Sequence, residues 1–321
     1  MIQALALWHD DIQSSSLHTH ELEWEGGKLL VRSAYSLISA GTEKLVASGQ
    51  VPDELSLQMA VPYMEGDFSL PVKYGYSLVA RVEKGPSPWV GRHVHLLHPH
   101  QSLCVVRPED CTPLPEKLPL QRATLASNLE TALNAMWDAG LAAGDRVLVV
   151  GFGTIGALLA LLARRHPAVE VVVSETDQAR RDRAIDLGFS LYDPTAGAFD
   201  LAFHASASAE GLQQCIDAVG KAGKVLEMSW YGKKKVAIRL GGSFHADRKQ
   251  LISSQVSSLP AVKKTRWTFA RRKRVVLELL MDDAWDALLD PPEPFFRSPD
   301  LFEGLRSGMS NKFSYLLEYT S

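Results

Sequence analysis

The residues best suited to chemistry in this chain are the glycine-rich run Gly151-Phe152-Gly153-Thr154-Ile155-Gly156. The run follows the apolar segment 147–150 and precedes the segment 157–165, which has the composition of a helix. Between a strand and a helix, Gly151 permits a tight turn, Gly153 lets a pyrophosphate approach the backbone, and Gly156 lets the helix pack closely on the strand. The arrangement predicts a dinucleotide bound at the helix N-terminus, with Thr154 and Ile155 also in contact.

Glu175 provides a second signal for the same ligand. It lies just past the apolar run 171–173, which predicts the next strand. A carboxylate there can accept hydrogen bonds from the ribose hydroxyls and repels a 2′-phosphate, so NAD(H) is favoured over NADP(H). Arg180 and Arg181 weaken this preference, because a nearby guanidinium can accommodate such a phosphate. An ordinary α/β unit with a glycine turn would not require this acid.

Composition limits the possible classes of protein. The chain has 321 residues, 46% of them hydrophobic, which is enough for two globular domains. A net charge of −3 gives no global electrostatic basis for binding nucleic acid or an anionic membrane. The N-terminal residues do not resemble a signal peptide, and no apolar run is long enough to cross a membrane. Only three cysteines occur, which predicts a reducing compartment, the cytoplasm by default: Cys104, Cys111 and Cys215.

The pattern of the chain changes near residue 127. Up to about residue 126, short alternating segments separated by Gly and Pro predict strands at 28–35, 77–83, 93–97 and 103–107. A helix is expected near 129–140, and from Arg146 strands and helices alternate. Further strands are expected at 200–203, 224–228 and 313–319, and helices at 210–219 and 274–281. The alternation predicts an α/β fold with a doubly wound parallel sheet.

Four short motifs give the chain a resemblance to the medium-chain dehydrogenase/reductase superfamily. The stretch 37–43 resembles its I-C-G-T-D turn, 71–77 its P-x-x-x-G-H-E motif, and 203–208 its F-E-x-T-G-S motif. Ser127 to Thr131 lie where many members carry a metal ligand and a nicotinamide-contacting threonine. Among members, the chain is most similar to the bacteriochlorophyllide a dehydrogenase type and to other zinc-type alcohol dehydrogenase homologues.

The resemblance implies a β-rich, GroES-like catalytic domain and a Rossmann domain with the active site in the cleft between them. The expected boundaries are 1–126 with 263–321 for the GroES-like domain and 127–262 for the Rossmann domain. The resemblance also implies a homodimer that acts on a small molecule.

The zinc ligands of the family are replaced in this chain. The family's Cys, His and third-ligand positions hold Ala40, Tyr76 and Ser127. Alanine cannot ligate, and neutral hydroxyls are poor zinc ligands beside thiolate or imidazole. Two cysteines, Cys104 and Cys111, cannot build the family's four-cysteine structural site. We therefore expect no zinc.

Without zinc, another group must stabilise the alkoxide that develops during carbonyl reduction. The resemblance places Thr42, Tyr76, His98 and Lys73 near the reaction. We expect Tyr76 and His98 to donate protons and Thr42 to relay them, with Glu43 orienting Tyr76 or a basic partner. Each residue also has an ordinary structural alternative: a turn hydroxyl, an apolar plug, a strand or loop histidine, and a solvated lysine.

Two charged or metal-like patterns have mainly structural interpretations. His93, His95, His98 and His100 are close in sequence, but Pro99 interrupts the strand and the spacing is not that of a metal site. The basic segment 263–274 is expected to be a solvated loop and helix start, or alternatively an anion site for a phosphorylated or carboxylated substrate.

Further cofactor contacts are expected at the carboxyl ends of parallel strands, where ligands bind in open α/β sheets. The candidates are Ala205, Ser206, Ser229 and Trp230, together with Thr131 and with Lys312 near the pyrophosphate by resemblance. The predicted function is zinc-independent, NAD(H)-dependent interconversion of an alcohol and a carbonyl. Two alternatives remain: an NADPH-dependent quinone or enoyl reductase, and a non-catalytic dinucleotide-binding protein.

Overall fold

The chain folds into two compact units. The structure, a computed structural model, describes residues 2–310 and 312–320. Unit 1 consists of residues up to Ser127 and from Leu277 onward, and unit 2 is Asn128–Val276. Each unit is described by itself below.

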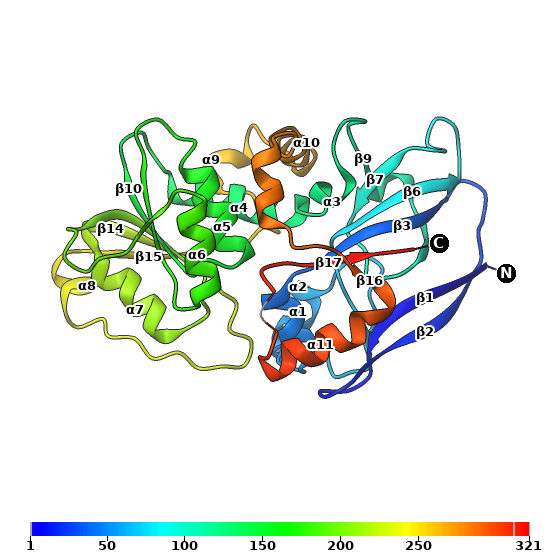
Figure 1. Ribbon diagram of the computed structural model, residues 1–321, viewed down its shortest axis with the longest axis horizontal. Helices are drawn as coiled ribbons and strands as arrows, with labels where there is room; N and C mark the ends of the chain where they lie inside the picture. Colours follow the sequence, from blue (N-terminus) through cyan, green and yellow to red (C-terminus); the bar gives the residue numbers. More distant parts are fainter. Residues whose placement is uncertain (1, 311, 321) are drawn as a thin grey trace. The chain divides into compact units, whose positions relative to one another are not determined.

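Unit 2 is built on a six-stranded parallel sheet in the order β12-β11-β10-β13-β14-β15. Figure 1 labels three of its strands, β10, β14 and β15. Its strands are β10 Arg146–Val150, β11 Glu170–Ser174, β12 Ser190–Leu191, β13 Phe199–His204, β14 Val219–Glu227 and β15 Gln250–Ser253. Its helices are α4 Ala126–Ala139, α5 Thr154–Ala163, α6 Gln178–Asp186, α7 Ala209–Ala218, α8 Ser243–Ala246, α9 Ala261–Lys264 and α10 Phe269–Leu279, with α4 and α10 crossing the unit boundaries.

Helices cover both faces of this sheet. On β10, Leu148 and Val150 share a buried cluster with Leu212 and Ile216 of α7. Val149 points to the other face, because side chains alternate along a strand, and there it lies against Gly156 of α5. The near-continuous apolar strands follow from this two-sided burial. The predicted doubly wound parallel sheet is thus confirmed.

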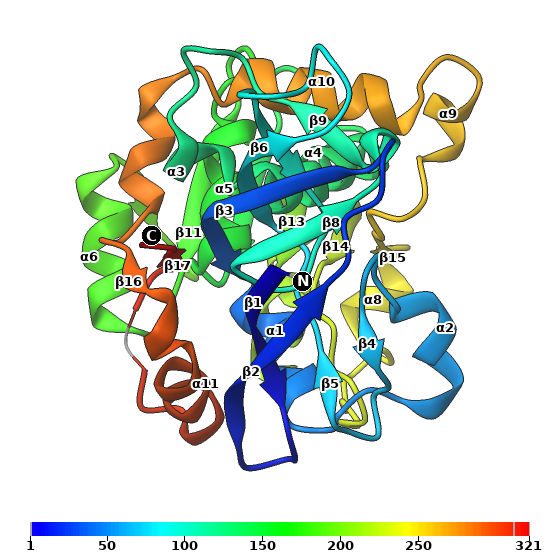
Figure 2. The ribbon, with the colours of Figure 1, turned by 90° about the vertical axis from the view of Figure 1, so that its right-hand side faces the viewer.

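Unit 1 contains a larger mixed sheet and a smaller antiparallel one. The larger sheet has the order β16-β17-β3-β6-β7-β9, with β8 also paired to β3. Its strands are β3 Leu29–Ile38, β6 Leu78–Lys84, β7 His93–Leu96, β8 Leu103–Val106, β9 Cys111–Pro113, β16 Glu293–Pro294 and β17 Tyr315–Glu318. The smaller sheet, β2-β1-β5-β4, lies in the lower half of Figure 2 and consists of β1 Ile2–His9, β2 Ser15–Leu22, β4 Glu65–Gly66 and β5 Val72–Lys73.

Short helices connect these strands: α1 Ala40–Ala47, α2 Ser56–Met59, α3 Leu120–Ala123 and α11 Ser298–Ser307, with 3-10 turns at Asp53–Leu55, Pro108–Asp110, Asp283–Leu288 and Phe295–Arg297. The predicted strands at 28–35, 77–83, 93–97 and 103–107 correspond to β3, β6, β7 and β8. The β1–β2 hairpin and α11 were not predicted. The β-rich first part of the predicted fold is confirmed.

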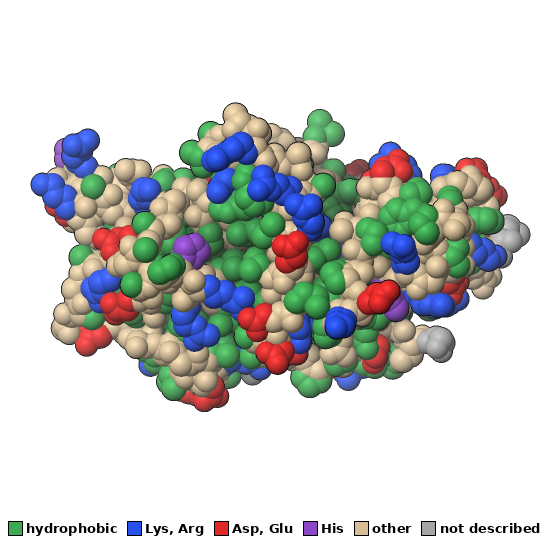
Figure 3. Space-filling view, turned by 90° about the horizontal axis from the view of Figure 1, so that it is seen from above, with side chains coloured by type: hydrophobic (Ala, Val, Ile, Leu, Met, Phe, Trp, Pro, Cys, Tyr) green, Lys and Arg blue, Asp and Glu red, His purple; other side chains and the backbone are tan. Residues whose placement is uncertain are grey.

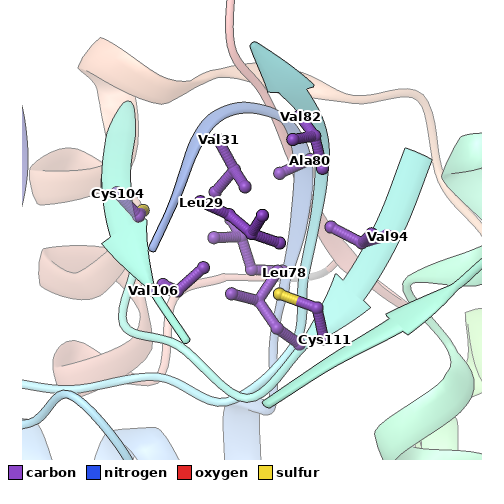
Figure 4. Close-up of a cluster of buried hydrophobic side chains, with 10 residues drawn as sticks. Leu29, Val31, Leu78, Ala80, Val82, Val94, Cys104, Val106 and Cys111 are labelled. Atoms are coloured by element: carbon purple, nitrogen blue, oxygen red, sulfur yellow. The ribbon is translucent and has the colours of Figure 1, made fainter. Parts of the chain in front are cut away.

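The interior of the larger sheet explains why these segments form strands. Leucine, valine and alanine side chains from β3, β6, β7 and β8 point toward one another, as Figure 4 shows, and pack with Cys104 and Cys111. All three cysteines of the chain are free and buried. Burial raises the pKa of the Cys104 and Cys111 thiols to about 12, so both behave as apolar core groups.

The basic segment belongs to unit 2, and this moves one predicted boundary. Residues 263–276 group with unit 2, whereas the sequence assigned them to the first domain. Trp267 packs against Trp137 of α4 with ring centroids 4.6 Å apart. Arg272 Nη1 donates to Asn134 Oδ1 at 2.8 Å, and its Nε lies 3.2 Å from Glu130 Oε1. These contacts with α4 attach α10 to unit 2.

Among residues 2–310 and 312–320, none of the helices combines the length and the hydropathy needed to cross a bilayer.

We predict that Leu78→Ala destabilises unit 1 by about 2–5 kcal/mol, because Leu78 is fully buried in the cluster of Figure 4 and its loss leaves a cavity. Leu57→Ala is the matched control, since Leu57 is 93% exposed, and should change stability by less than about 0.5 kcal/mol. Urea unfolding followed by fluorescence measures both. Equal effects of the two substitutions would contradict the packing described for this core.

Candidate functional site

The glycine run forms the predicted turn between β10 and α5. Gly151 has φ +94°, a conformation that side chains disfavour, and its N–H donates to Ser174 O at 2.8 Å. A Cβ at Gly156 would lie 1.8 Å from Gly151 O, so only glycine allows α5 to approach the turn this closely. Gly153 is the N-cap of α5, and Thr154 and Ile155 begin its first turn. The N-terminal end of α5 therefore opens beside the turn, as an anion site requires.

Glu175 lies directly after β11, and its side-chain carboxylate accepts hydrogen bonds from backbone N–H groups of the glycine turn and of the residues that follow Glu175. Its Oε2 accepts the N–H of Phe152 at 2.7 Å, and its Oε1 accepts the N–H groups of Thr176 and Asp177 at 2.6 and 2.9 Å. A carboxylate offers about four acceptor positions, so Oε2 can accept one more donor. That position suits a ribose hydroxyl of a nucleotide bound at the turn.

Arg180 lies beside the same turn. Its Nη1 is 3.7 Å from the position that a Cβ of Gly153 would occupy. Arg181 instead donates to the backbone oxygen of Glu175 at 3.2 Å. A guanidinium at this place can face a phosphate group, so the acid and the base next to the turn have opposite effects on the choice of dinucleotide.

The ends of β13 and β14 carry the other predicted cofactor contacts of unit 2. Ala205 donates to Val150 O at 2.8 Å, and a Cβ at Gly151 would lie 2.7 Å from Ser206 N, so this segment lies against the glycine turn. Ser229 Oγ accepts the N–H of Ala207 at 3.0 Å, and Trp230 is the next residue. Thr131 lies on α4. Ala205, Ser206, Ser229 and Trp230 therefore lie just after the carboxyl ends of β13 and β14, where the topology predicted them.

In unit 1, the three former metal positions are close to one another, but their side chains do not form a zinc site. Ala40 is the first residue of α1 and has no donor atom. Ser127 Oγ donates to the backbone oxygen of Tyr76 at 2.8 Å and lies 3.3 Å from His95 Nε2. Among the described residues, no group of three or more His, Cys, Asp or Glu side chains is placed to hold a metal ion.

The Tyr76 hydroxyl is hydrogen-bonded to Ser39 and Thr42. Thr42 is the residue expected to relay protons. Burial and the nearby Glu43 carboxylate raise the pKa of the Tyr76 phenol, while hydrogen bonds with Ser39 and Thr42 oppose the shift. The phenol is therefore protonated at neutral pH. It can donate a proton or a hydrogen bond, and it is a poor base.

Glu43 is held by a histidine that the sequence did not single out for catalysis. Glu43 and His100 are both fully buried, with His100 Nε2 2.8 Å from Glu43 Oε2. His100 Nδ1 lies 2.7 Å from Ser36 Oγ, which lies 2.9 Å from the hydroxyl of Tyr319. His100 thus lies in contact with Glu43, where a basic partner was expected, and the orienting role of Glu43 stays a prediction. His100 was considered only as part of the histidine run, because it follows Pro99 in a turn.

The environments of His98 and Lys73 do not suit the predicted proton transfer. His98 stacks on Tyr63 with ring centroids 5.0 Å apart, and its Nδ1 donates to Pro99 O at 2.8 Å. Burial lowers the pKa of His98 to about 3, so the ring is neutral near pH 7. Lys73 is 2% exposed, forms an ion pair with Glu65, and donates to Gln101 Oε1 at 2.9 Å. Both side chains are thus buried among protein partners in unit 1.

Two other predicted anion-binding groups already have protein partners. Lys312 Nζ lies 2.6 Å from Glu293 Oε1, and this pair lowers the pKa of the Glu293 carboxyl. In the basic segment, Lys263 and Arg271 lie over the Trp267 ring at 5.4 and 4.0 Å. Figure 3 shows Lys and Arg side chains gathered on the surface around α10. Much of the basic segment thus packs on α4 and on aromatic rings.

We predict that acidification destabilises unit 1, because burial lowers the pKa of two of its histidines, His9 and His98, to about 3. The unfolded chain binds protons at these histidines near pH 6.5, whereas the folded chain does not, so stability falls as pH drops below 6.5. The expected slope is about 1.4 kcal/mol per pH unit for each histidine. Urea unfolding at pH 7 and pH 5 should show a smaller difference for His98→Asn. The same substitution at exposed His245 should leave the difference unchanged. An unchanged slope in His98→Asn would contradict this.

Known proteins match part of this chain in sequence and nearly all of it in structure. No protein-family model matches the chain. D-guloside 3-dehydrogenase of Escherichia coli K12 is 26% identical over 206 residues, which cover 59% of this chain and 59% of that protein. The chain thus matches about three fifths of the length of this curated relative.

Two solved structures show the same fold over nearly the whole chain. An alcohol dehydrogenase of E. coli CFT073 in complex with NADH has a TM-score of 0.76 at 14% identity and covers 99% of each chain. TarJ of Staphylococcus aureus in complex with NADPH has a TM-score of 0.73 at 15% identity and covers 100% of each chain. Together with the sequence relatives, which are named as dehydrogenases, this fold supports the resemblance to the medium-chain dehydrogenase/reductase superfamily.

Proposed function

We propose that the chain is an NAD(H)-dependent oxidoreductase that interconverts an alcohol and a carbonyl on a small molecule without zinc. The observation that carries the proposal is the glycine turn clamped by Glu175, whose carboxylate binds the backbone N–H of Phe152. A nucleotide bound at this turn would find an acceptor for its ribose hydroxyls on the Glu175 carboxylate. The dehydrogenase activity of the relatives supports the reaction class.

A bound nicotinamide would supply the hydride. The residues of unit 1 supply the proton that a reduced carbonyl oxygen needs. In the proposed reaction, the Tyr76 hydroxyl gives its proton to that oxygen, and the Ser39 and Thr42 hydroxyls hydrogen-bond to the phenolate that forms. In the reverse direction the substrate alcohol gives its proton to the Tyr76 phenolate, which restores the phenol.

The zinc-independent part of the proposal rests on the donor set. A zinc ion needs three protein ligands in a catalytic site, and Ala40 supplies none. The Ser127 hydroxyl is directed at the Tyr76 backbone oxygen. Neutral phenol and hydroxyl groups bind zinc poorly. In the proposed reaction, the Tyr76 hydroxyl therefore takes the place of zinc as the group that stabilises the developing alkoxide.

Arg180 favours a second candidate, an NADPH-dependent quinone or enoyl reductase. Its guanidinium, next to Gly153, could bind a 2′-phosphate. Glu175 opposes that phosphate by like charge. The relative affinity for the two dinucleotides therefore separates the two candidates.

We predict that NADH binds more tightly than NADPH and that Glu175→Gln reduces or reverses the preference, because it removes the charge that repels a 2′-phosphate. A change of about tenfold in the ratio of dissociation constants corresponds to about 1.4 kcal/mol. Fluorescence titration with each dinucleotide measures it. Glu170→Gln is the matched control, since Glu170 lies at the other end of β11 and pairs with Arg146. A wild-type preference for NADPH would favour the reductase alternative.

We predict that Tyr76→Phe lowers kcat by about 10²–10⁴-fold with little effect on NADH affinity, because it removes only the proton donor. Tyr74→Phe is the matched control: Tyr74 is 1% exposed and its hydroxyl donates to Met59 O at 3.2 Å. Steady-state assays with secondary alcohols and polyols, and with the matching carbonyls, measure the effect. Equal turnover in Tyr76→Phe and Tyr74→Phe would exclude Tyr76 as the donor.

A further inference from the structure

A second chemical constellation lies at the carboxyl ends of β13 and β14. His204 and Glu227 end these neighbouring parallel strands and are paired across the sheet. His204 Nδ1 lies 2.8 and 2.9 Å from the two carboxylate oxygens of Glu227. On the other side of the ring, His204 Nε2 lies 2.8 Å from Ser206 Oγ. Serine, histidine and carboxylate are thus connected in the order used for nucleophilic catalysis.

The hydrogen bonds of this triad have a defined direction. An ionised carboxylate only accepts, so His204 Nδ1 carries the proton donated to Glu227. In the neutral ring, Nε2 is then the acceptor and Ser206 donates its hydroxyl proton to it. Glu227 is fixed in turn by the Ser229 N–H at 2.7 Å and the Tyr231 hydroxyl at 3.0 Å. His204 is fully buried, whereas Ser206 is exposed.

The backbone around Ser206 is shaped for this contact. Ala207 has φ +51°, a conformation uncommon for a residue with a side chain, and it turns the chain from β13 into α7. A Cβ at Gly211 would lie 2.2 Å from Ser206 Oγ and 3.0 Å from His204 Nε2. Only glycine at this position leaves room for the serine–histidine pair. A strand, a strained turn carrying the serine, and a helix follow one another, as in the nucleophile turn of hydrolases.

An anion that forms at Ser206 would face the start of α7. This helix has ten residues and is capped by Ser208, whose Oγ accepts the N–H of Gly211 at 3.0 Å. Ala209 and Glu210 are the first two residues of α7, so their N–H groups have no acceptor within the helix. Unused N–H groups in the first turn, together with the helix dipole, stabilise negative charge.

We propose that Ser206, His204 and Glu227 form a nucleophilic triad that hydrolyses carboxylic esters, an activity separate from hydride transfer. Ser206 Oγ attacks the ester carbonyl carbon while its proton moves to His204 Nε2. The tetrahedral oxyanion then collapses, the C–O bond to the alcohol breaks, and the alcohol leaves with the proton from Nε2. Water attacks the acyl-serine, again giving a proton to Nε2, and the acid departs as Ser206 recovers its proton.

The triad lies next to the nucleotide turn, since a Cβ at Gly151 would lie 2.7 Å from Ser206 N. A dinucleotide at the turn would therefore cover Ser206. The two activities are expected to exclude each other, so that NADH slows acylation.

The test is covalent labelling of the full chain with a fluorophosphonate, which forms a bond from phosphorus to a nucleophilic serine oxygen and releases fluoride. Intact mass should show one adduct, and peptide mapping should place it on Ser206. The adduct should be absent in Ser206→Ala, and His204→Gln should slow labelling by about 10²-fold or more. Hydrolysis of p-nitrophenyl acetate should fall in parallel.

Ser174→Ala is the matched control, because Ser174 ends β11 and donates to Gln214. It should label at the wild-type rate, and thermal unfolding of each variant reports whether it folds. An unlabelled wild-type chain, or equal labelling of folded Ser206→Ala, would overturn the proposal. Labelling of Ser206 without NADH protection would retain the triad and count against the nucleotide site, so the two proposals fail separately.

Discussion

No side chain fits between the glycine turn of unit 2 and the elements that it joins. A Cβ at Gly156 would lie 1.8 Å from Gly151 O, and a Cβ at Gly151 would lie 2.7 Å from Ser206 N. One backbone turn therefore positions the start of α5 on one side and the segment after β13 on the other. Glu175 joins this turn to β11 through the Phe152 N–H. The proposed nucleotide site and the proposed Ser206 triad both depend on this close approach of backbone to backbone.

In unit 1, an equivalent constraint is the buried carboxylate of Glu43. A fully buried charge must be hydrogen-bonded, and Glu43 accepts from Ser39 N at 2.7 Å and lies 2.8 Å from His100 Nε2. From His100 the contacts continue through Ser36 to the hydroxyl of Tyr319, which directly follows β17. The same carboxylate helps to keep Tyr76 protonated. Near the positions that the resemblance assigns to zinc ligands, this chain thus carries the Tyr76 hydroxyl and a buried polar network around Glu43.

The sequence predicted the local parts of this architecture and missed the parts formed by distant residues. The turn at 151–156 and the acid Glu175 follow from strand and helix periodicity over a short stretch. The boundary near residue 263 was misplaced because Trp267 and Arg272 contact α4, more than a hundred residues earlier. The sequence predicted a proton-transfer role for His98 and none for His100, because the positions of histidines in a sequence do not show how buried each ring is or which groups it contacts. The pairing of His204 with Glu227 required the β13–β14 register, which only the fold defines.

The measurement that tests the central claim most directly is hydride transfer by the chain before and after removal of metal. The purified protein would be dialysed against a chelator, its zinc content determined by mass spectrometry, and NADH formation followed with a panel of alcohols and polyols. The account predicts turnover that is unchanged by chelation and unrelated to zinc content, because Tyr76 supplies the proton. Turnover that falls with the zinc content and returns when zinc is added would contradict it.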